Sequence, residues 1–156
     1  MSRLYALLIL ALAAGLPAAQ AVPNLPPALD LRADAEQARR ARVPLLVFFS
    51  AYSCPYCREV EELYLQPMHA RPASAGRVMI RVVRIDSQRT LYDFEGRRTD
   101  HAAWAGRHGV ALTPTIKFLD SAGRELAPAL VGLSTREFYG GYLEEAIDRA
   151  LGRLRG

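Results

Sequence analysis

The sequence predicts a single domain of the α/β class, because helical and strand-like patterns alternate along most of its length. A continuous apolar run at residues 44–50, PLLVFFS, is too short for a helix of its own and is typical of a strand buried on both faces of a sheet. A second run, RVMIRVVRID at residues 77–86, is rich in β-branched residues and indicates another strand. The chain has 156 residues, 51% of them apolar, which is enough for one sizeable core.

The expected elements follow in the order helix, strand, helix, strand, helix, strand, strand, helix. The first helix covers residues 31–42, where alanines and leucine recur at helical spacing, and Pro44 follows it. The second covers residues 55–66, and Pro67 is expected to end or kink it. A short irregular insertion or hairpin is expected around residues 87–98.

The C-terminal half begins with a short helix, for which Thr99 or Asp100 is the N-cap and Gly109 the stop. TPTIKFLDSAGREL, residues 113–126, then predicts a strand, a tight turn and a returning strand.

The last expected helix covers residues 134–151, with a capping box formed by Ser134 and Glu137. Its apolar face is expected to consist of Phe138, Tyr142, Leu143 and Ile147.

Residues 1–21 have the pattern of a secretory signal peptide. Arg3 precedes an apolar run over residues 4–16, and the alanines at 19 and 21 supply the small side chains that a signal peptidase reads. An uncleaved membrane anchor is the alternative, but the run is shorter than the roughly 20 apolar residues of a spanning helix. We therefore expect cleavage after Ala21, which leaves a lead at residues 22–30 and a domain at residues 31–153.

Export would place the protein in an oxidising compartment, which in bacteria is the periplasm, where a disulfide persists. Removal of residues 1–21 lowers the formal net charge from +4 to +3, and the arginines are scattered among acidic residues. A nucleic-acid surface requires clustered basic residues with interleaved aromatics. We expect no nucleic-acid partner.

Both cysteines of the chain, Cys54 and Cys57, lie in the motif SCPYC directly after the first expected strand. As a structural staple they would close a loop of about four residues, for which the entropy model gives only roughly 2 kcal/mol. As a metal site they would need two further ligands, and the histidines at 69, 101 and 108 lie at no zinc-finger spacing. We expect no metal here.

A redox pair fits this position best. Cys54 directly precedes a helix, and Pro55 suits the first helical position, where its missing N–H is no loss. The free N–H groups and the dipole of the helix would stabilise a thiolate on Cys54 and make it the nucleophile. Cys57, one turn further, is placed to attack a mixed disulfide and release the substrate. A structural or vestigial pair is the alternative.

Two stretches, LLVFFSAYSCPYC at residues 45–57 and GVALTPTIKFLDSAGREL at residues 109–126, closely resemble the thioredoxin superfamily. The resemblance extends over roughly residues 31–151. It implies a thioredoxin fold, in which helices flank a central mixed sheet and a cis-proline faces the C-x-x-C pair. Pro114 matches that proline, and the backbone of the preceding Thr113 is then expected to pair with an extended substrate segment. A proline at the start of a strand is the alternative.

Within the superfamily the chain looks most like exported bacterial thioredoxin-related proteins, including SoxW-like thioredoxins. The CPYC motif, with Pro55 and Tyr56, is also similar to that of a periplasmic disulfide isomerase, but the chain lacks the isomerase's N-terminal dimerisation domain, so a monomer is expected. A chemical departure lies at Phe48, where cytosolic thioredoxins bury an aspartate. The proton relay of that aspartate is then absent, or is supplied by water or another group such as Glu59.

The resemblance implies a periplasmic thiol:disulfide oxidoreductase that exchanges disulfides with protein substrates. Three carboxylates that follow the motif, Glu59, Glu61 and Glu62, disfavour a thiolate, which indicates the role of a reductant kept reduced by a membrane or periplasmic thiol donor. No bound cofactor is needed, because electrons travel as dithiol and disulfide. A thioredoxin-like metal-binding chaperone and a non-catalytic binding module are the alternatives. Tyr52 and Tyr56 form a contact surface for partners or else pack around the active-site helix.

Overall fold

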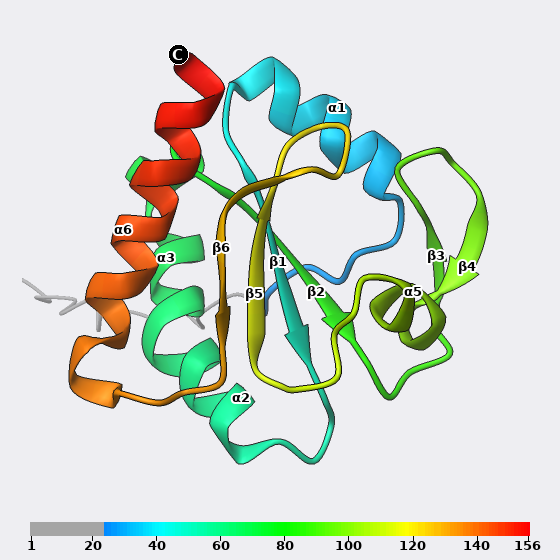
Figure 1. Ribbon diagram of the computed structural model, residues 1–156, viewed down its shortest axis with the longest axis horizontal. Coiled ribbons are helices and arrows are strands. Elements are labelled where there is room, and N and C mark those ends of the chain that lie inside the picture. The colour runs from blue at the N-terminus through cyan, green and yellow to red at the C-terminus, as the bar shows by residue number, and fades with distance from the viewer. Residues whose placement is uncertain (1–23) are drawn as a thin grey trace, which may run out of the picture.

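A four-stranded mixed sheet forms the centre of the computed structural model, which describes residues 24–156 (Figure 1). The strand order is β2-β1-β5-β6. The parallel pair consists of β1 (Leu45–Ser50) and β2 (Met79–Arg84), while β5 (Thr115–Leu119) runs antiparallel to β1 and to β6 (Glu125–Val131). The predicted strands are therefore confirmed, and helices cover both faces of the sheet.

The central strand β1 is buried along its whole length, as its continuous apolar sequence predicts. Successive side chains of a strand point to opposite faces. Leu46 and Phe48 accordingly enter one core, and Leu45, Val47 and Phe49 enter the other. Each core lies between the sheet and a separate set of helices, and all five side chains are inaccessible to solvent.

Of the two expected outcomes at Pro67, an end or a kink of the helix, the end is wrong, because the helix after the cysteines continues past Pro67. It continues from α2 (Pro55–Val60) through a π-helical turn, η1 (Glu61–Leu65), into α3 (Gln66–Ala70), and the short α4 (Pro72–Ala75) follows. In the π turn the N–H of Gln66 bonds to the carbonyl of Glu61, five residues back. Proline offers no N–H and its ring clashes with the carbonyl four residues earlier, and a widened turn directly before it relieves both effects.

The long C-terminal helix, α6 (Arg136–Arg155), packs on the same face of the sheet as α2 and α3 (Figure 1). Its N-cap is Thr135, with no side-chain hydrogen bond, so the predicted capping box of Ser134 and Glu137 is wrong.

The buried face of α6 also differs from the prediction, although Leu143 and Ile147 are buried as expected. Phe138 and Tyr142 are exposed, and the remaining buried positions are Tyr139, Ala146, Ala150 and Leu151. Phe138 lies five residues before Leu143 and thus about 140° around the helix from it. The adjacent Tyr139, four residues before Leu143, points into the core instead.

The other face of the sheet carries α1 (Leu31–Ala41), α5 (His101–Arg107) and a small hairpin of β3 (Thr90–Tyr92) and β4 (Arg98–Asp100) (Figure 1). The insertion expected around residues 87–98 is therefore a hairpin. Asp100 caps α5, because its Oδ1 accepts the N–H of Ala103 at 2.8 Å.

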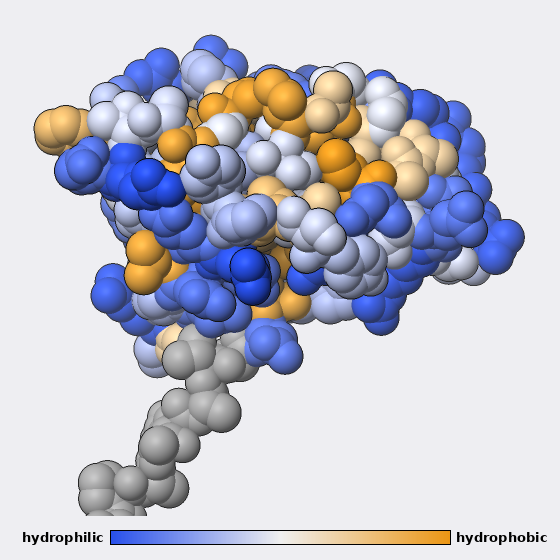
Figure 2. Space-filling view, turned by 90° about the horizontal axis from the view of Figure 1, so that it is seen from below, coloured by the Kyte–Doolittle hydropathy of each residue, from blue (hydrophilic) through white to orange (hydrophobic). Residues whose placement is uncertain are grey.

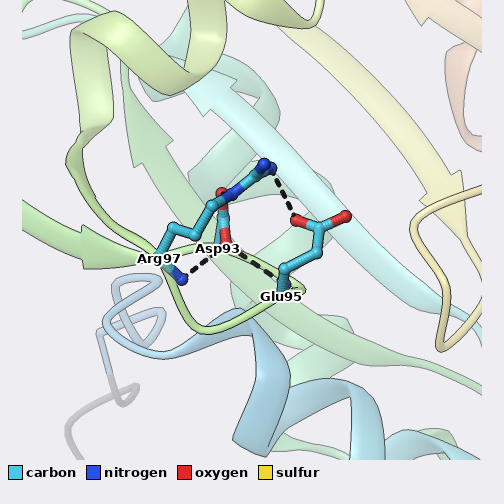
Figure 3. A network of polar contacts seen from close by, with 3 residues as sticks. All are labelled: Asp93, Glu95 and Arg97. Atoms are coloured by element: carbon cyan, nitrogen blue, oxygen red, sulfur yellow. Dashed lines mark hydrogen bonds and ion pairs between the residues drawn. The ribbon is translucent and has the colours of Figure 1, made fainter.

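The turn of this hairpin is held by the carboxylate of Asp93 (Figure 3). Its Oδ1 accepts the backbone N–H groups of Glu95 and Arg97, and its Oδ2 accepts Nε of Arg97 at 2.9 Å. Burial by itself would raise the pKa of Asp93, but these hydrogen bonds together lower it below its usual value.

The lead before α1 is part of the fold. Ala28 donates its N–H to the carbonyl of Val82 at 2.8 Å, and the N–H of Val82 bonds to the carbonyl of Pro26 at 2.9 Å. Residues 26–28 thus pair with the outer edge of β2 and residues 29–30 with β3, and Leu25 and Ala28 are buried. The expected signal peptide, residues 1–21, lies outside the described residues. From Asn24 onwards, no helix is long and apolar enough to cross a membrane.

Candidate active site

A disulfide joins Cys54 and Cys57 where the chain passes from β1 into α2. β1 ends at Ser50, residues 51–53 form a short turn, and α2 begins at Pro55. Pro55 is therefore at the first helical position, as the sequence predicts. The structure brings the two cysteines together at the carboxyl end of the central strand.

Cys54 is the N-cap of α2. Its Sγ accepts the N–H of Cys57 at 3.1 Å, and its backbone is extended. An N-cap acceptor interacts with the unpaired N–H groups and the positive end of the helix dipole. A thiolate at Cys54 would be stabilised by the same groups.

The two sulfurs are in different environments. Cys54 is partly exposed, whereas Cys57 is only 1% exposed and lies in the core with Phe48 and Val60. A substrate disulfide can therefore reach Cys54 but not Cys57. This inequality matches the roles of attacking and resolving cysteine.

Thr113 and Pro114 lie at the same edge of the sheet as the disulfide. Thr115 at the start of β5 pairs with Phe49, next to the last residue of β1, so the two preceding residues reach the edge where β1 ends. The Thr113-Pro114 peptide bond is cis, and Pro114 accepts the N–H of Gly132 at 2.7 Å. Within the described residues, no backbone hydrogen bond uses the N–H or C=O of Thr113.

A family model described as a thioredoxin-like domain matches residues 31–147. The chain belongs to this family. None of the curated proteins compared with this thioredoxin-like domain matches it significantly.

Solved thioredoxin structures share the fold at low sequence identity. A poplar thioredoxin h mutant is 18% identical and superposes with a TM-score of 0.56 over 86% of this chain and 92% of its own. Trichomonas vaginalis thioredoxin is 19% identical, with a TM-score of 0.53 over 83% and 98%. Oxidised mitochondrial thioredoxin 3 of Saccharomyces cerevisiae is 15% identical, with a TM-score of 0.52 over 80% and 93%. The predicted thioredoxin fold is confirmed.

The thioredoxin-like domain exposes both tyrosines of its active-site region. Tyr52 is 67% exposed and Tyr56 is 53% exposed, which leaves their rings available to a partner. Each ring lies near a guanidinium, with Cζ of Arg84 4.9 Å from the Tyr52 centroid and Cζ of Arg136 5.4 Å from that of Tyr56. Such cation–π contacts hold an exposed ring in place.

Figure 2 looks onto this end of the molecule and shows apolar residues grouped on the upper part of the face, with hydrophilic residues around them. Two exposed apolar side chains at this edge of the sheet are Leu112, directly before Thr113, and Val131, which pairs with Thr115. A substrate segment that contacts Thr113 would meet both.

The buried carboxylates of residues 24–156 are Asp93 and Asp120, which hold the turns of two hairpins, and Phe48 belongs to the same buried cluster as Cys57. Glu59, which the sequence offers as a substitute proton relay, instead binds Arg136, Oε1 to Nε, at 2.6 Å. The hydrogen bond that Arg136 donates to Glu59 raises the pKa of Arg136. Its carboxylate therefore points toward α6.

The histidines do not join the cysteines. Among residues 24–156, no three His, Cys, Asp or Glu side chains are grouped as metal ligands. His101 is buried, its Nδ1 accepts the N–H of Arg84 at 3.0 Å, and its Nε2 donates to the carbonyl of Ala28 at 2.7 Å. Burial lowers the pKa of His101, so the ring is neutral and has a structural role.

The sequence reasoning missed the two arginines at the site, Arg84 and Arg136. The signal for Arg84 was available, because it ends the strand parallel to β1 and its register partner is Ser50. Arg136 lies far along the chain, and no local pattern connects it to Glu59.

Proposed function

We propose that this thioredoxin-like domain is a thiol:disulfide oxidoreductase that exchanges disulfides with protein substrates. The observation that carries the proposal is the pairing of an accessible Cys54 at a helix N-terminus with a buried Cys57. A disulfide that only stabilised the fold would not require one accessible and one buried cysteine. Its short loop would also stabilise the fold little.

In the reducing direction, the Cys54 thiolate attacks one sulfur of the substrate disulfide and the other substrate sulfur leaves as a thiolate. The Cys57 thiol, once deprotonated, then attacks Sγ of Cys54 in the mixed disulfide. The second substrate thiolate is released and the Cys54–Cys57 disulfide forms, so two electrons have moved to the substrate. An upstream thiol donor in the membrane or periplasm returns them, and no bound cofactor takes part.

The substrate segment is proposed to pair with the free backbone groups of Thr113, alongside Pro114. Tyr52 is proposed to contact the same partner through its exposed ring. Backbone pairing with an extended segment accepts many sequences, which suits an enzyme with several protein substrates.

Trapping experiments test the assignment of the two cysteines. The Cys57→Ala variant should accumulate mixed disulfides on Cys54, because the resolving thiol is missing, and the matched Cys54→Ala variant should accumulate none. Gel mobility under non-reducing conditions would show the trapped species. If neither variant traps a partner and the wild type does not reduce insulin, the oxidoreductase proposal is wrong, and metal titration of the reduced protein would then test the metal-chaperone alternative.

The protein is further proposed to act as an exported, periplasmic monomer of the SoxW-like type. The proposal rests on the signal-peptide pattern in residues 1–21 and on a cysteine pair that is joined as a disulfide. Intact-mass measurement of periplasmic material should give a chain that begins at Val22. A mass that retains residues 1–21 would make the protein a membrane-anchored one, and light scattering would report the oligomeric state.

A further inference from the structure

A pocket of about 130 Å³ lies beside the active-site disulfide, between the lead and the end of β2. Leu25, Pro27 and Val82 form its apolar part. Two further lining residues flank the disulfide: Tyr52 is two residues before Cys54, and Glu61 is four residues after Cys57 on the same helical segment. Residues that precede and follow the motif in sequence thus line the pocket, whereas the two cysteines themselves do not.

Arg84 is held in a fixed position in this pocket. Its guanidinium stacks over the ring of Tyr52, and Nη1 lies 3.4 Å from Oγ of the buried Ser50. The register of β1 and β2 places Arg84 directly beside Ser50. A guanidinium fixed in this way loses little conformational entropy when it binds an anion.

The arginines of the pocket have no acidic partner. Neither Arg84 nor Arg89 forms an ion pair with any carboxylate of residues 24–156, whereas Arg81, three residues before Arg84, binds Asp34 at 2.6 Å. Ser87 also lines the pocket, and its Oγ accepts a hydrogen bond from the backbone N–H of Arg89 at 3.2 Å. Both arginines thus line the pocket, and the positive charges of both lower the pKa of His101, which lines it as well.

One carboxylate lines the pocket, and two others, Asp86 and Asp100, lie near its lining residues. Glu61 is the one carboxylate among the lining residues, so the pocket carries two positive charges and one negative charge. Asp86 lies outside the lining and accepts the N–H of Tyr52 at 2.8 Å with Oδ2. Burial lowers the pKa of His101, as do the charges of Arg89 and Arg84, while the hydrogen bond to Ala28 and the charge of Asp100 act in the opposite sense; the net direction is downward, so the ring adds no positive charge at neutral pH. The two lining arginines, neither of them ion-paired in the described part of the chain, are the groups that would bind an anionic ligand here.

We propose that this pocket binds a carboxylate of the substrate, an Asp or Glu side chain close to the substrate's reactive cysteine. Tyr52 and Cys54 are two residues apart across a short turn, so their backbones lie at most about 7 Å apart. The acidic residue is accordingly expected about two positions from the reactive cysteine. This inference rests on the proposed function, and it adds a selection among substrates that backbone pairing at Thr113 does not provide.

The test uses disulfide peptides that differ only by Glu or Gln two residues from the cysteine, reduced at low ionic strength. The Glu peptide should have a kcat/KM about fivefold higher, mostly through KM, as expected for a partly exposed charge pair. Arg89→Gln should remove this preference. Arg153→Gln, which loses the same charge near the far end of α6, is the matched control and should keep it.

A second arm compares bis(2-carboxyethyl) disulfide with neutral bis(2-hydroxyethyl) disulfide. The proposal is supported if the protein reduces both the acidic small compound and the Glu peptide faster than their neutral counterparts. If only the acidic small compound is preferred, the pocket does not bind an acidic side chain of a protein substrate. Equal kcat/KM for the Glu and Gln peptides, or loss of the preference in Arg153→Gln, also overturns the inference but leaves the proposed function standing. If neither peptide is reduced, the proposed function itself fails.

Discussion

Arg136 at the start of α6 donates from Nε to Oε1 of Glu59 at 2.6 Å, and its guanidinium lies over the ring of Tyr56. The contact joins the C-terminal helix to the helix that carries the disulfide. Glu59 is two residues beyond Cys57, so a positive charge balances one of the carboxylates nearest the sulfurs. The charge of Arg136 is therefore part of the electrostatic environment of the Cys54 thiolate.

Replacement of Arg136 should make the reduction potential more negative. Without the guanidinium, the charge of Glu59 disfavours the Cys54 thiolate and so destabilises the reduced form. For a partly exposed pair we expect Arg136→Gln to shift the potential by about 5 to 20 mV. Equilibration with glutathione buffers would measure the shift.

The matched control for that variant is Arg149→Gln. Arg149 forms a similar exposed pair with Glu145 on the same helix, at 2.7 Å. Its loss should leave the potential unchanged. Equal shifts in both variants would mean that the reduction potential responds to the net charge of α6 rather than to the contact between Arg136 and Glu59.

Phe48→Ala should lower the free energy of unfolding by about 3 to 5 kcal/mol, because it leaves a cavity in a fully buried cluster. Phe138→Ala is the control, since that ring is 61% exposed and its loss should cost at most about 0.5 kcal/mol. Urea denaturation would measure both. A small effect at Phe48 would contradict the tight packing of the core around Cys57.

His101 should make the protein less stable in mild acid. Burial lowers its pKa from the ordinary value of 6.5, so the unfolded chain binds the proton more readily than the folded one. Its contribution to stability is fully present above about pH 6.5 and is lost as the pH falls below that value. Thermal unfolding between pH 7.5 and 5 should show this loss.

The His101→Gln variant, which carries no titrating ring, should have a flatter pH profile in that window. His69→Gln is the control, because His69 is exposed on α3 and should leave the profile of the wild type unchanged. A slope that survives in His101→Gln would assign the pH dependence to other groups.

The order of elements could be predicted from the sequence because each element carries its own periodicity. The apolar run of β1 and the proline directly after Cys54 depend on local chemistry alone. The course of the chain past Pro67 could not be predicted, since a proline can either end a helix or be accommodated by a widened turn, and the local sequence does not decide between the two. The buried face of α6 was misjudged for a similar reason, because Phe138 and Tyr139 are both aromatic and only tertiary packing selects Tyr139.

In the candidate site, too, the residues of a local motif could be predicted and the partners from distant segments could not. Cys54, Cys57 and Pro55 form a contiguous motif, and the resemblance to thioredoxins pointed to Pro114. The partners from distant segments were missed, because Arg136 reaches Glu59 across 77 residues of sequence. The sequence also counted Glu59 as an unbalanced negative charge, which the structure shows to be paired.

That pairing bears on the direction of electron flow. The N-terminus of α2 stabilises the Cys54 thiolate and makes the pair more oxidising, while the acidic residues after Cys57 act in the opposite sense. With Glu59 balanced by Arg136, the remaining acidic groups within the next turn are Glu61 and Glu62. Solvent screens both, because neither is buried.

We therefore expect an intermediate potential of roughly −170 to −240 mV, compared with about −270 mV for thioredoxin and about −120 mV for the strongest periplasmic oxidant. The fraction oxidised in glutathione buffers gives this number, and Glu61→Gln should make it less negative. A wild-type potential near −120 mV would make the protein an oxidant and contradict the proposed role as a reductant.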